Sequence, residues 1–194
     1  MPSAITMLKA DHAKLKRLLR ELSETTNRGV KTREELVRQI ERNLKTHAQL
    51  EEEVFYPAFK AVAEDREEED LFYEAEEEHH VVDMVLPALK AANPRSNEFK
   101  AKAKVLKDLV EHHIREEEGE MFKAAQQLFD ADQMRELSEL MTSRRETIEA
   151  MWESPLTRPV KKLQSAAHKL MPTKVKTLKA TAIAKAMQAA DSRR

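Results

Sequence analysis

The sequence of 194 residues contains no cysteine and only two glycines, and aromatic residues make up 5% of it. The lack of cysteine excludes disulfides, thiolate catalysis and cysteine-ligated iron–sulfur clusters. The chain also lacks any run of about 18 apolar residues, so we expect no membrane-spanning helix. The first residues, MPSAITMLKADH, lack the uninterrupted apolar core of a signal peptide. These absences together predict a cytoplasmic protein.

The residues that are abundant favour long helices. Charged residues make up 36% and hydrophobic residues 41% of the chain, a composition rich in Ala, Leu, Glu, Lys and Arg. The charge is divided unevenly, because residues 154–194 carry a net charge of +9 and residues 1–153 carry −10. This division predicts a folded domain over 1–153 and a basic, proline-interrupted, flexible tail over 154–194.

Apolar residues recur at helical spacing in four segments, which predicts an all-α fold with four long helices. Short connections between them favour an antiparallel up-down-up-down four-helix bundle. Ser3 is a candidate cap for the first helix, Thr32 and Glu35 form a candidate capping box for the second, and Ser96 or Asn97 is a candidate cap for the fourth. The acidic segment 64–70 has no apolar stripe and is predicted to be a loop.

An extra C-terminal helix is expected from about residue 132 to residue 152, with Asp130 or Asp132 as its cap. Its residues Leu137, Leu140, Met141 and Ile148 are available to pack on the outside of the bundle.

Histidine interrupts the apolar stripe of each of the four helices, and a glutamate follows it four residues later on two of them. Burying such groups without partners costs several kcal/mol, whereas a metal ion offsets that cost. Residues four apart project from the same helix face. An imidazole and a carboxylate from each of two helices provide the nitrogen and oxygen ligands of a dinuclear iron or manganese site. The predicted metal ligands are His12, His47, Glu51, His79, His113 and Glu117.

Two of these histidines belong to doublets. His79 and His113 lie in the apolar stripes, whereas the neighbouring His80 and His112 are rotated by about 100° around the helix. The stripes therefore favour His79 and His113, although a π-bulge of one residue would change either choice.

The segments around these histidines resemble the hemerythrin-like, or HHE cation-binding, family. The matching segments are LKADHAKLKRLL, LKTHAQLEEEVFYPAF, EEEHHVVDMVLPAL and LVEHHIREEEGEMFKAA, in the family's order over roughly residues 3–130. The resemblance implies a four-helix bundle with two non-haem iron ions, bridged by oxo or hydroxo groups. It also leaves the last carboxylate open, because the oxygen carriers of the family use a five-residue step that would select Glu118 in place of Glu117.

The third helix departs from the pattern of the oxygen carriers, which have a second histidine where this chain has Asp83. Either Asp83 is a ligand, or His80 takes that place, or one iron has an additional open position. More carboxylate and fewer imidazoles favour Fe(III). Asp11, Glu78 and Tyr56 are candidates for contacts behind the ligands.

These observations predict a di-iron protein that senses or reacts with dioxygen, peroxide or nitric oxide, and catalase-like peroxide consumption is the enzymatic version. The alternative is an iron-buffering or stress-response binding module without turnover, and a helical interaction protein that binds zinc or no metal is a third interpretation. The basic tail has three alternative interpretations: it is attracted to nucleic acid or another anionic partner, it docks on the acidic bundle, or it is disordered.

Overall fold

A computed structural model describes residues 2–63 and 66–153, so the predicted basic tail lies outside the described residues. The described residues are helical apart from short connections, and none of them forms a strand, which confirms the all-α fold. None of their helices is both long and apolar enough to cross a membrane. The elements are α1 (Ala4–Glu24), α2 (Val30–Leu50), η1 (Glu51–Phe55), α3 (Tyr56–Val62), α4 (Arg66–Ala91), α5 (Asn97–Glu116), η2 (Glu117–Met121), α6 (Phe122–Leu128) and α7 (Ala131–Glu153).

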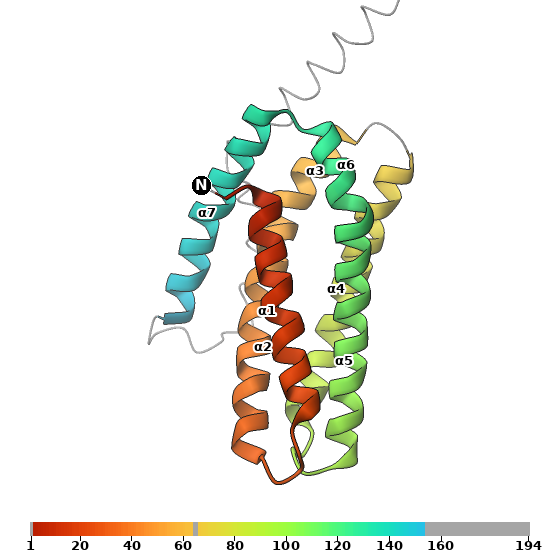
Figure 1. The fold of residues 1–194 in the computed structure, drawn as a ribbon, viewed down its shortest axis with the longest axis vertical. Coiled ribbons are helices and arrows are strands. Elements are labelled where there is room, and N and C mark those ends of the chain that lie inside the picture. The colour runs from red at the N-terminus through yellow and green to blue at the C-terminus, as the bar shows by residue number, and fades with distance from the viewer. Residues whose placement is uncertain (1, 64–65, 154–194) are drawn as a thin grey trace, which may run out of the picture.

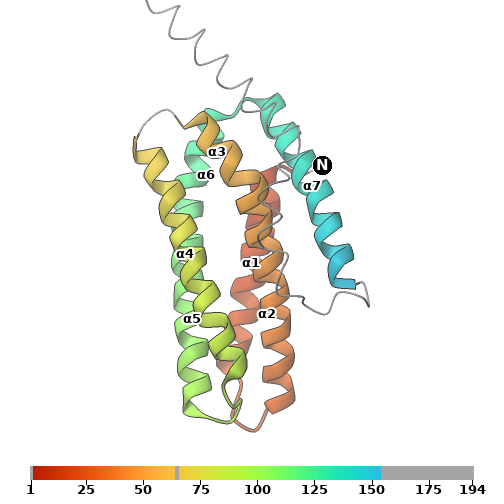
Figure 2. The ribbon, with the colours of Figure 1, turned by 180° about the vertical axis from the view of Figure 1, so that it is seen from behind.

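Four long rods lie side by side in this part of the chain, and the direction reverses from each rod to the next (Figure 1). The rods are α1, the continuous α2–η1–α3, α4, and the continuous α5–η2–α6. The fifth helix, α7, lies outside the bundle against α1, α2 and η1 (Figure 2). It contributes the buried side chains of Leu137, Met141 and Ile148, as its apolar positions predicted.

The elements η1 and η2 are single π-helical turns inside otherwise α-helical rods. The N–H of Tyr56 donates to the carbonyl of Glu51, and the N–H of Phe122 donates to the carbonyl of Glu117, each over five residues. In the rod α2–η1–α3, Pro57 lacks the N–H that would bond to the carbonyl of Glu53, which favours a local rearrangement of the hydrogen-bond ladder. Each π turn begins at a predicted metal ligand.

Two predicted helix starts are wrong. The second helix begins at Val30 after Gly29 and has no side-chain cap, so Thr32 and Glu35 do not form a capping box there. The helix α4 begins at Arg66 and includes most of the acidic segment predicted as a loop. Acidic side chains in the first turn are stabilised by the partial positive charge of a helix N-terminus. The lack of an apolar stripe therefore did not mean the lack of a helix.

The predicted caps at the starts of α1, α5 and α7 are confirmed. The hydroxyls of Ser3 and Ser96 accept hydrogen bonds from the N–H groups of Thr6 and Phe99. Asp130 accepts from the N–H of Gln133, whose side-chain oxygen accepts from the N–H of Asp130.

The core consists of two apolar clusters with a polar layer between them. On α1, Leu8 belongs to one cluster and Leu15 to the other, and the buried His12 lies between them. The same layering occurs on α5 and η2, where the buried Glu117 lies between Ile114 of one cluster and Met121 of the other. Burial of apolar side chains at about 25 cal/mol per Å² stabilises both ends of the bundle. The two clusters therefore hold the polar layer between them in place.

Candidate metal centre

Four histidines converge in the polar layer, one from each rod. His12, His47 and His113 are buried, and the side chain of His79 is 11% exposed. The Nε2 atoms of His12 and His47 are 3.0 Å apart, and those of His79 and His113 are 3.3 Å apart. Each of these imidazoles therefore points one nitrogen toward the interior.

Two buried carboxylates lie between the histidine pairs. Glu51 lies 3.1 Å from Nε2 of His47 through Oε1 and 3.4 Å from Nε2 of His79 through Oε2. The Oε2 atom of Glu117 lies 3.2 Å from Nε2 of His12 and 3.4 Å from Nε2 of His113. Each carboxylate thus faces one histidine of the α1–α2 pair and one of the α4–α5 pair.

The structure brings together all six residues predicted as ligands. Their donor atoms form two sets, in each of which the atoms lie within 4.8 Å of one another. The first set contains His12, His47, Glu51 and Glu117, and the second contains Glu51, His79 and His113. Because Glu51 belongs to both sets, the arrangement suits two ions that share a carboxylate.

Several buried atoms in this layer have no hydrogen-bond partner among the described residues: Nδ1 of His47, both carboxylate oxygens of Glu51 and Oε2 of Glu117. A buried polar atom without a partner costs about 1–3 kcal/mol, and a charged one costs more. Cations bound to these carboxylate oxygens would remove that cost. The residues therefore fit a metal centre.

The pKa values of the two buried carboxylates are shifted in opposite directions. Burial, followed by the charge of Glu117, raises the pKa of Glu51 well above its ordinary value. Burial also acts to raise the pKa of Glu117, but the charge of His113 and the hydrogen bond with His12 lower it. The hydroxyl of Tyr56 donates to Oε1 of Glu117 over 2.8 Å. Burial and the charge of Glu117 raise the pKa of this phenol, so it keeps its proton and remains a donor.

A second carboxylate lies behind each inward-facing histidine, near its outer nitrogen, Nδ1. Glu118 is 2.9 Å from Nδ1 of His12, Glu52 is 2.9 Å from Nδ1 of His79 and Glu78 is 2.8 Å from Nδ1 of His113. Asp11 is 3.6 Å from Nδ1 of His47. Such carboxylates fix the orientation of a ligating imidazole and make it a stronger base.

These outer carboxylates form a closed ring around the bundle. Each is the sequence neighbour of a candidate ligand on its own rod, and each contacts the histidine of the next rod. The order of contacts is Asp11 to His47, Glu52 to His79, Glu78 to His113 and Glu118 to His12. Asp11, Glu78 and Tyr56 were predicted to lie behind the ligands, whereas Glu52 and Glu118 were missed. Adjacency to a predicted ligand was the signal that could have identified them.

Three residues that the sequence left open as ligands, Glu118, His80 and Asp83, lie outside the two donor sets. Glu117 points inward, whereas Glu118 contacts His12 from outside and is 31% exposed. His80 and Asp83 are exposed and belong to neither donor set. The set with His79 and His113 therefore has three protein ligands against four in the other set. His112 is 50% exposed and lies beside Glu78 and Glu116.

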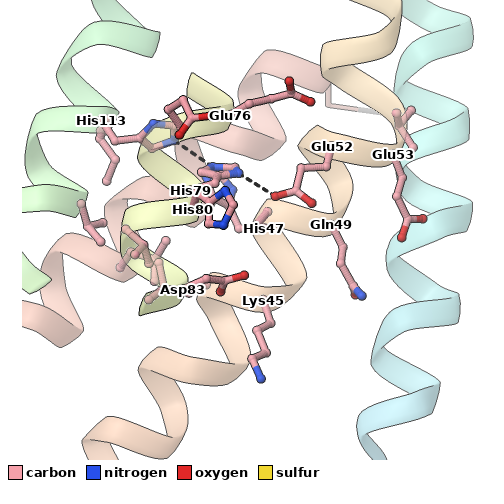
Figure 3. Close-up of a pocket in the computed structure, with 18 of the residues that line it drawn as sticks. Lys45, His47, Gln49, Glu52, Glu53, Glu76, His79, His80, Asp83 and His113 are labelled. Atoms are coloured by element: carbon pink, nitrogen blue, oxygen red, sulfur yellow. Dashed lines mark hydrogen bonds and ion pairs between the residues drawn. The ribbon is translucent and has the colours of Figure 1, made fainter. Parts of the chain in front are cut away.

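A groove of about 1090 Å³ runs between α2 and α4 and reaches the centre on the side of His79 and His113. Its floor includes the apolar side chains of Leu15, Val110 and Ile114. Figure 3 shows His47, His79 and His113 in this groove, with His80 and Asp83 of α4 along the same wall. The groove thus reaches both histidines of the half with fewer protein ligands, and His47 of the other half.

Residues 3–125 match the family described as hemerythrin HHE cation binding domain. A hemerythrin HHE cation binding domain-containing protein from Mycobacterium kansasii has a similar solved structure, with a TM-score of 0.70 and 25% identity over 83% of this chain and 96% of that one. A DNA nickase from Nostoc sp. is 30% identical over 127 residues, which are 66% of this chain and 34% of the relative. The chain therefore matches about a third of that relative's length.

Proposed function

The chain belongs to the hemerythrin HHE cation-binding domain family, and from that membership we propose that it holds two non-haem iron ions and senses or reacts with a small oxidant. The observation that carries the proposal is the convergence of four imidazoles on two buried carboxylates, of which both oxygens of Glu51 and Oε2 of Glu117 lack hydrogen-bond partners among the described residues. His12, His47, Glu51 and Glu117 would hold one ion, and Glu51, His79 and His113 the other.

Iron at this position would supply one-electron chemistry toward dioxygen, peroxide or nitric oxide. The protein supplies the surroundings. Tyr56 holds one oxygen of Glu117 through its hydrogen bond and leaves the other facing His12 and His113. Leu15, Val110 and Ile114 line the groove with apolar surface next to the centre. A small neutral molecule can therefore approach along the groove between α2 and α4.

Reaction or sensing is favoured over reversible carriage of dioxygen. Neither His80 nor Asp83 belongs to a donor set, so the second set lacks the additional imidazole that oxygen carriers have. A site with a smaller share of imidazole and a larger share of carboxylate stabilises Fe(III), which does not bind dioxygen reversibly. Peroxide consumption of the catalase type is the enzymatic form of this proposal.

The first test is the metal content of full-length protein purified from iron-supplemented cells. We expect two irons per chain and visible charge-transfer bands that change when azide or peroxide is added. Zinc alone, or no metal with an unchanged melting temperature, would contradict the proposal. Steady peroxide turnover that is lost in His113→Ala would identify an enzyme. A single spectral change without turnover would identify a sensor or an iron buffer.

A second candidate is a binding module that reports its metal state without turnover. The match to a protein named DNA nickase favours it, because the matching segment is about a third of a longer protein whose name refers to DNA. In this alternative, iron occupancy stabilises the bundle and the basic segment 154–194 contacts a nucleic acid. Iron loading without peroxide consumption, together with DNA binding that depends on metal, would support this candidate over the first.

A further inference from the structure

Several polar contacts attach α7 to the bundle. The N–H of Ala4, at the start of α1, donates to the hydroxyl of Ser138 over 2.8 Å. Arg144 donates to both oxygens of Glu53 in η1, at 2.6 and 2.9 Å. Arg145 donates to both oxygens of Asp11 in α1, at 3.0 and 2.5 Å. The two arginines thus form equivalent forked ion pairs on neighbouring parts of the bundle.

Only one of these ion pairs continues to a candidate metal ligand. Asp11, held by Arg145, lies 3.6 Å from Nδ1 of His47. That nitrogen has no hydrogen-bond partner in the described part of the chain, and Asp11 is the carboxylate placed beside it. Nε2 of the same ring faces Glu51 at 3.1 Å and His12 at 3.0 Å. No corresponding contact joins Glu53, the partner of Arg144, to a histidine of the centre.

We propose that Arg145 is a positioning residue for His47, which it orients through Asp11, so that docking of α7 and metal binding at the α1–α2 half of the centre are coupled. The inference depends on the proposed metal centre. A guanidinium fork fixes both oxygens of a carboxylate and therefore the direction in which that carboxylate faces. Without Arg145, the side chain of Asp11, which is 17% exposed, is free to turn toward water.

Coupling of this kind acts in both directions. If the docked α7 strengthens metal binding, then bound metal strengthens the docking of α7 by the same factor. The helix α7 directly precedes residue 154. The occupancy of the centre therefore changes the hold on the element from which the C-terminal segment departs.

The test compares Arg145→Gln with Arg144→Gln in the full-length protein. Both variants remove one forked pair from an arginine that is 23% exposed, so Arg144→Gln is a matched control for the docking of α7. Co²⁺ is titrated against a competing chelator, and binding is followed by its visible absorption. We expect Arg145→Gln to weaken binding of one of the two ions about tenfold, the lower end of effects at such outer contacts. Arg144→Gln should stay within about twofold of the wild type, while the metal-free melting temperature falls equally in both. An equal effect of the two variants on Co²⁺ affinity would overturn the inference.

A double-mutant cycle with Asp11→Asn tests the route. If Arg145 acts through Asp11, Arg145→Gln should have no further effect on Co²⁺ affinity in the Asp11→Asn background. A full additional effect would overturn the inference. Arg145→Lys, which keeps the charge without the fork, should give an intermediate affinity and serves if the glutamine variant does not fold.

Hydrogen exchange gives a readout that does not depend on affinity. Co²⁺ loading should slow amide exchange between Ser138 and Ile148 of α7 in the wild type and in Arg144→Gln, but not in Arg145→Gln. Equal slowing in all three proteins would overturn the coupling. A wild-type chain that takes up no Co²⁺ would overturn the metal centre itself, whereas normal uptake that Arg145→Gln does not affect would overturn the inference alone.

Discussion

Each imidazole of the centre is positioned from two sides. Its Nε2 atom faces Glu51 or Glu117, and its Nδ1 atom faces an outer carboxylate of another rod. The outer group determines which nitrogen carries the proton and leaves the inner one as a lone-pair donor. The outer carboxylates therefore set the orientation and the protonated nitrogen of the imidazoles in the centre.

The choice between Glu117 and Glu118 is testable by substitution. Glu117→Gln should lose at least one of the two metals after dialysis, because its buried oxygen lies between His12 and His113. Glu118→Gln should keep two metals with roughly 10- to 100-fold lower affinity, since it removes only the outer contact of His12. Metal analysis and chelator competition measure both. The reverse result would assign the ligand to the five-residue step.

Metal binding should release protons, and His79 is one source. Burial acts to lower the pKa of His79, but the carboxylates of Glu51 and Glu52 outweigh it and raise the pKa to about 10 in the metal-free protein. The imidazole is therefore protonated at pH 7, and an arriving cation must displace that proton. Metal affinity should rise with pH up to about 10. Burial lowers the pKa of His47 to about 4, so His47 is already neutral at pH 7.

Calorimetry in buffers of different ionisation enthalpy counts the released protons. Glu52→Gln removes one carboxylate beside His79 and should reduce the count at pH 7. The stability of the metal-free protein should depend on pH in the opposite sense to metal affinity and fall as pH rises. Protonated His79 stabilises the fold fully below pH 6.5, its unfolded pKa, and this contribution is lost as pH rises through 10. Equal proton release by the wild type and Glu52→Gln would contradict this assignment.

At the scale of single residues, sequence patterns predicted the inward layer better than the outer one. The ligand stripes were evident because a charged residue on an apolar face is conspicuous. Glu52 and Glu118 lie in runs of glutamates, and their contacts with His79 and His12 depend on the packing of two rods. No spacing within one helix contains that information.

The elements that place these residues are helices with a single π turn at the position of the carboxylates. The number of long helices followed from apolar periodicity, their alternating direction from the short connections, and the caps Ser3 and Ser96 from residue type. The π turns could not be predicted in this way, because a hydrogen bond over five residues shifts the helical register of all the residues that follow it on the rod. The segment 66–70 was missed because its helix begins on acidic residues before any apolar stripe.

The π turn η2 contains Gly119, and substitution of this residue tests whether the turn requires glycine. A Cβ atom at this position meets nothing within 4 Å, and the backbone does not have positive φ. Gly119→Ala should therefore raise the free energy of unfolding by about 0.5–1 kcal/mol, since glycine loses more backbone entropy on folding. Thermal unfolding of the metal-free protein measures the change, and metal content should stay the same. A loss of stability would mean that η2 needs the conformational freedom of glycine.

The whole molecule consists of two halves with different surroundings. The helix α7 packs on α1, α2 and η1, the elements that carry His12, His47 and Glu51, whereas the groove is lined by both His79 and His113 and, from the first half, by His47. One half is thus suited to stable attachment and the other to exchange with small molecules. The basic segment 154–194 follows α7, and its charge of +9 opposes the −10 of the rest of the chain.

If segment 154–194 contacts DNA, binding should depend strongly on salt. The logarithm of the affinity should fall with the logarithm of salt concentration with a slope of roughly −0.9 per phosphate contacted. Deletion of 154–194 should abolish binding. Replacing Lys161, Lys162 and Lys169 by glutamine should reduce the slope by up to about 3. The matched control replaces exposed lysines of the bundle, Lys9, Lys14 and Lys100, and should change little. DNA binding that survives the deletion would exclude this segment as the contact.

The ring of outer carboxylates also bears on how the chain reaches its native state. Each rod orients the histidine of the next, so a packing with one rod out of register loses an inner ligand and an outer carboxylate at the same time. Such a misassembled bundle would bind metal weakly even when its apolar clusters are nearly complete. Because a ligand stabilises only the form that binds it, metal bound at the proposed centre would favour the native packing over such alternatives.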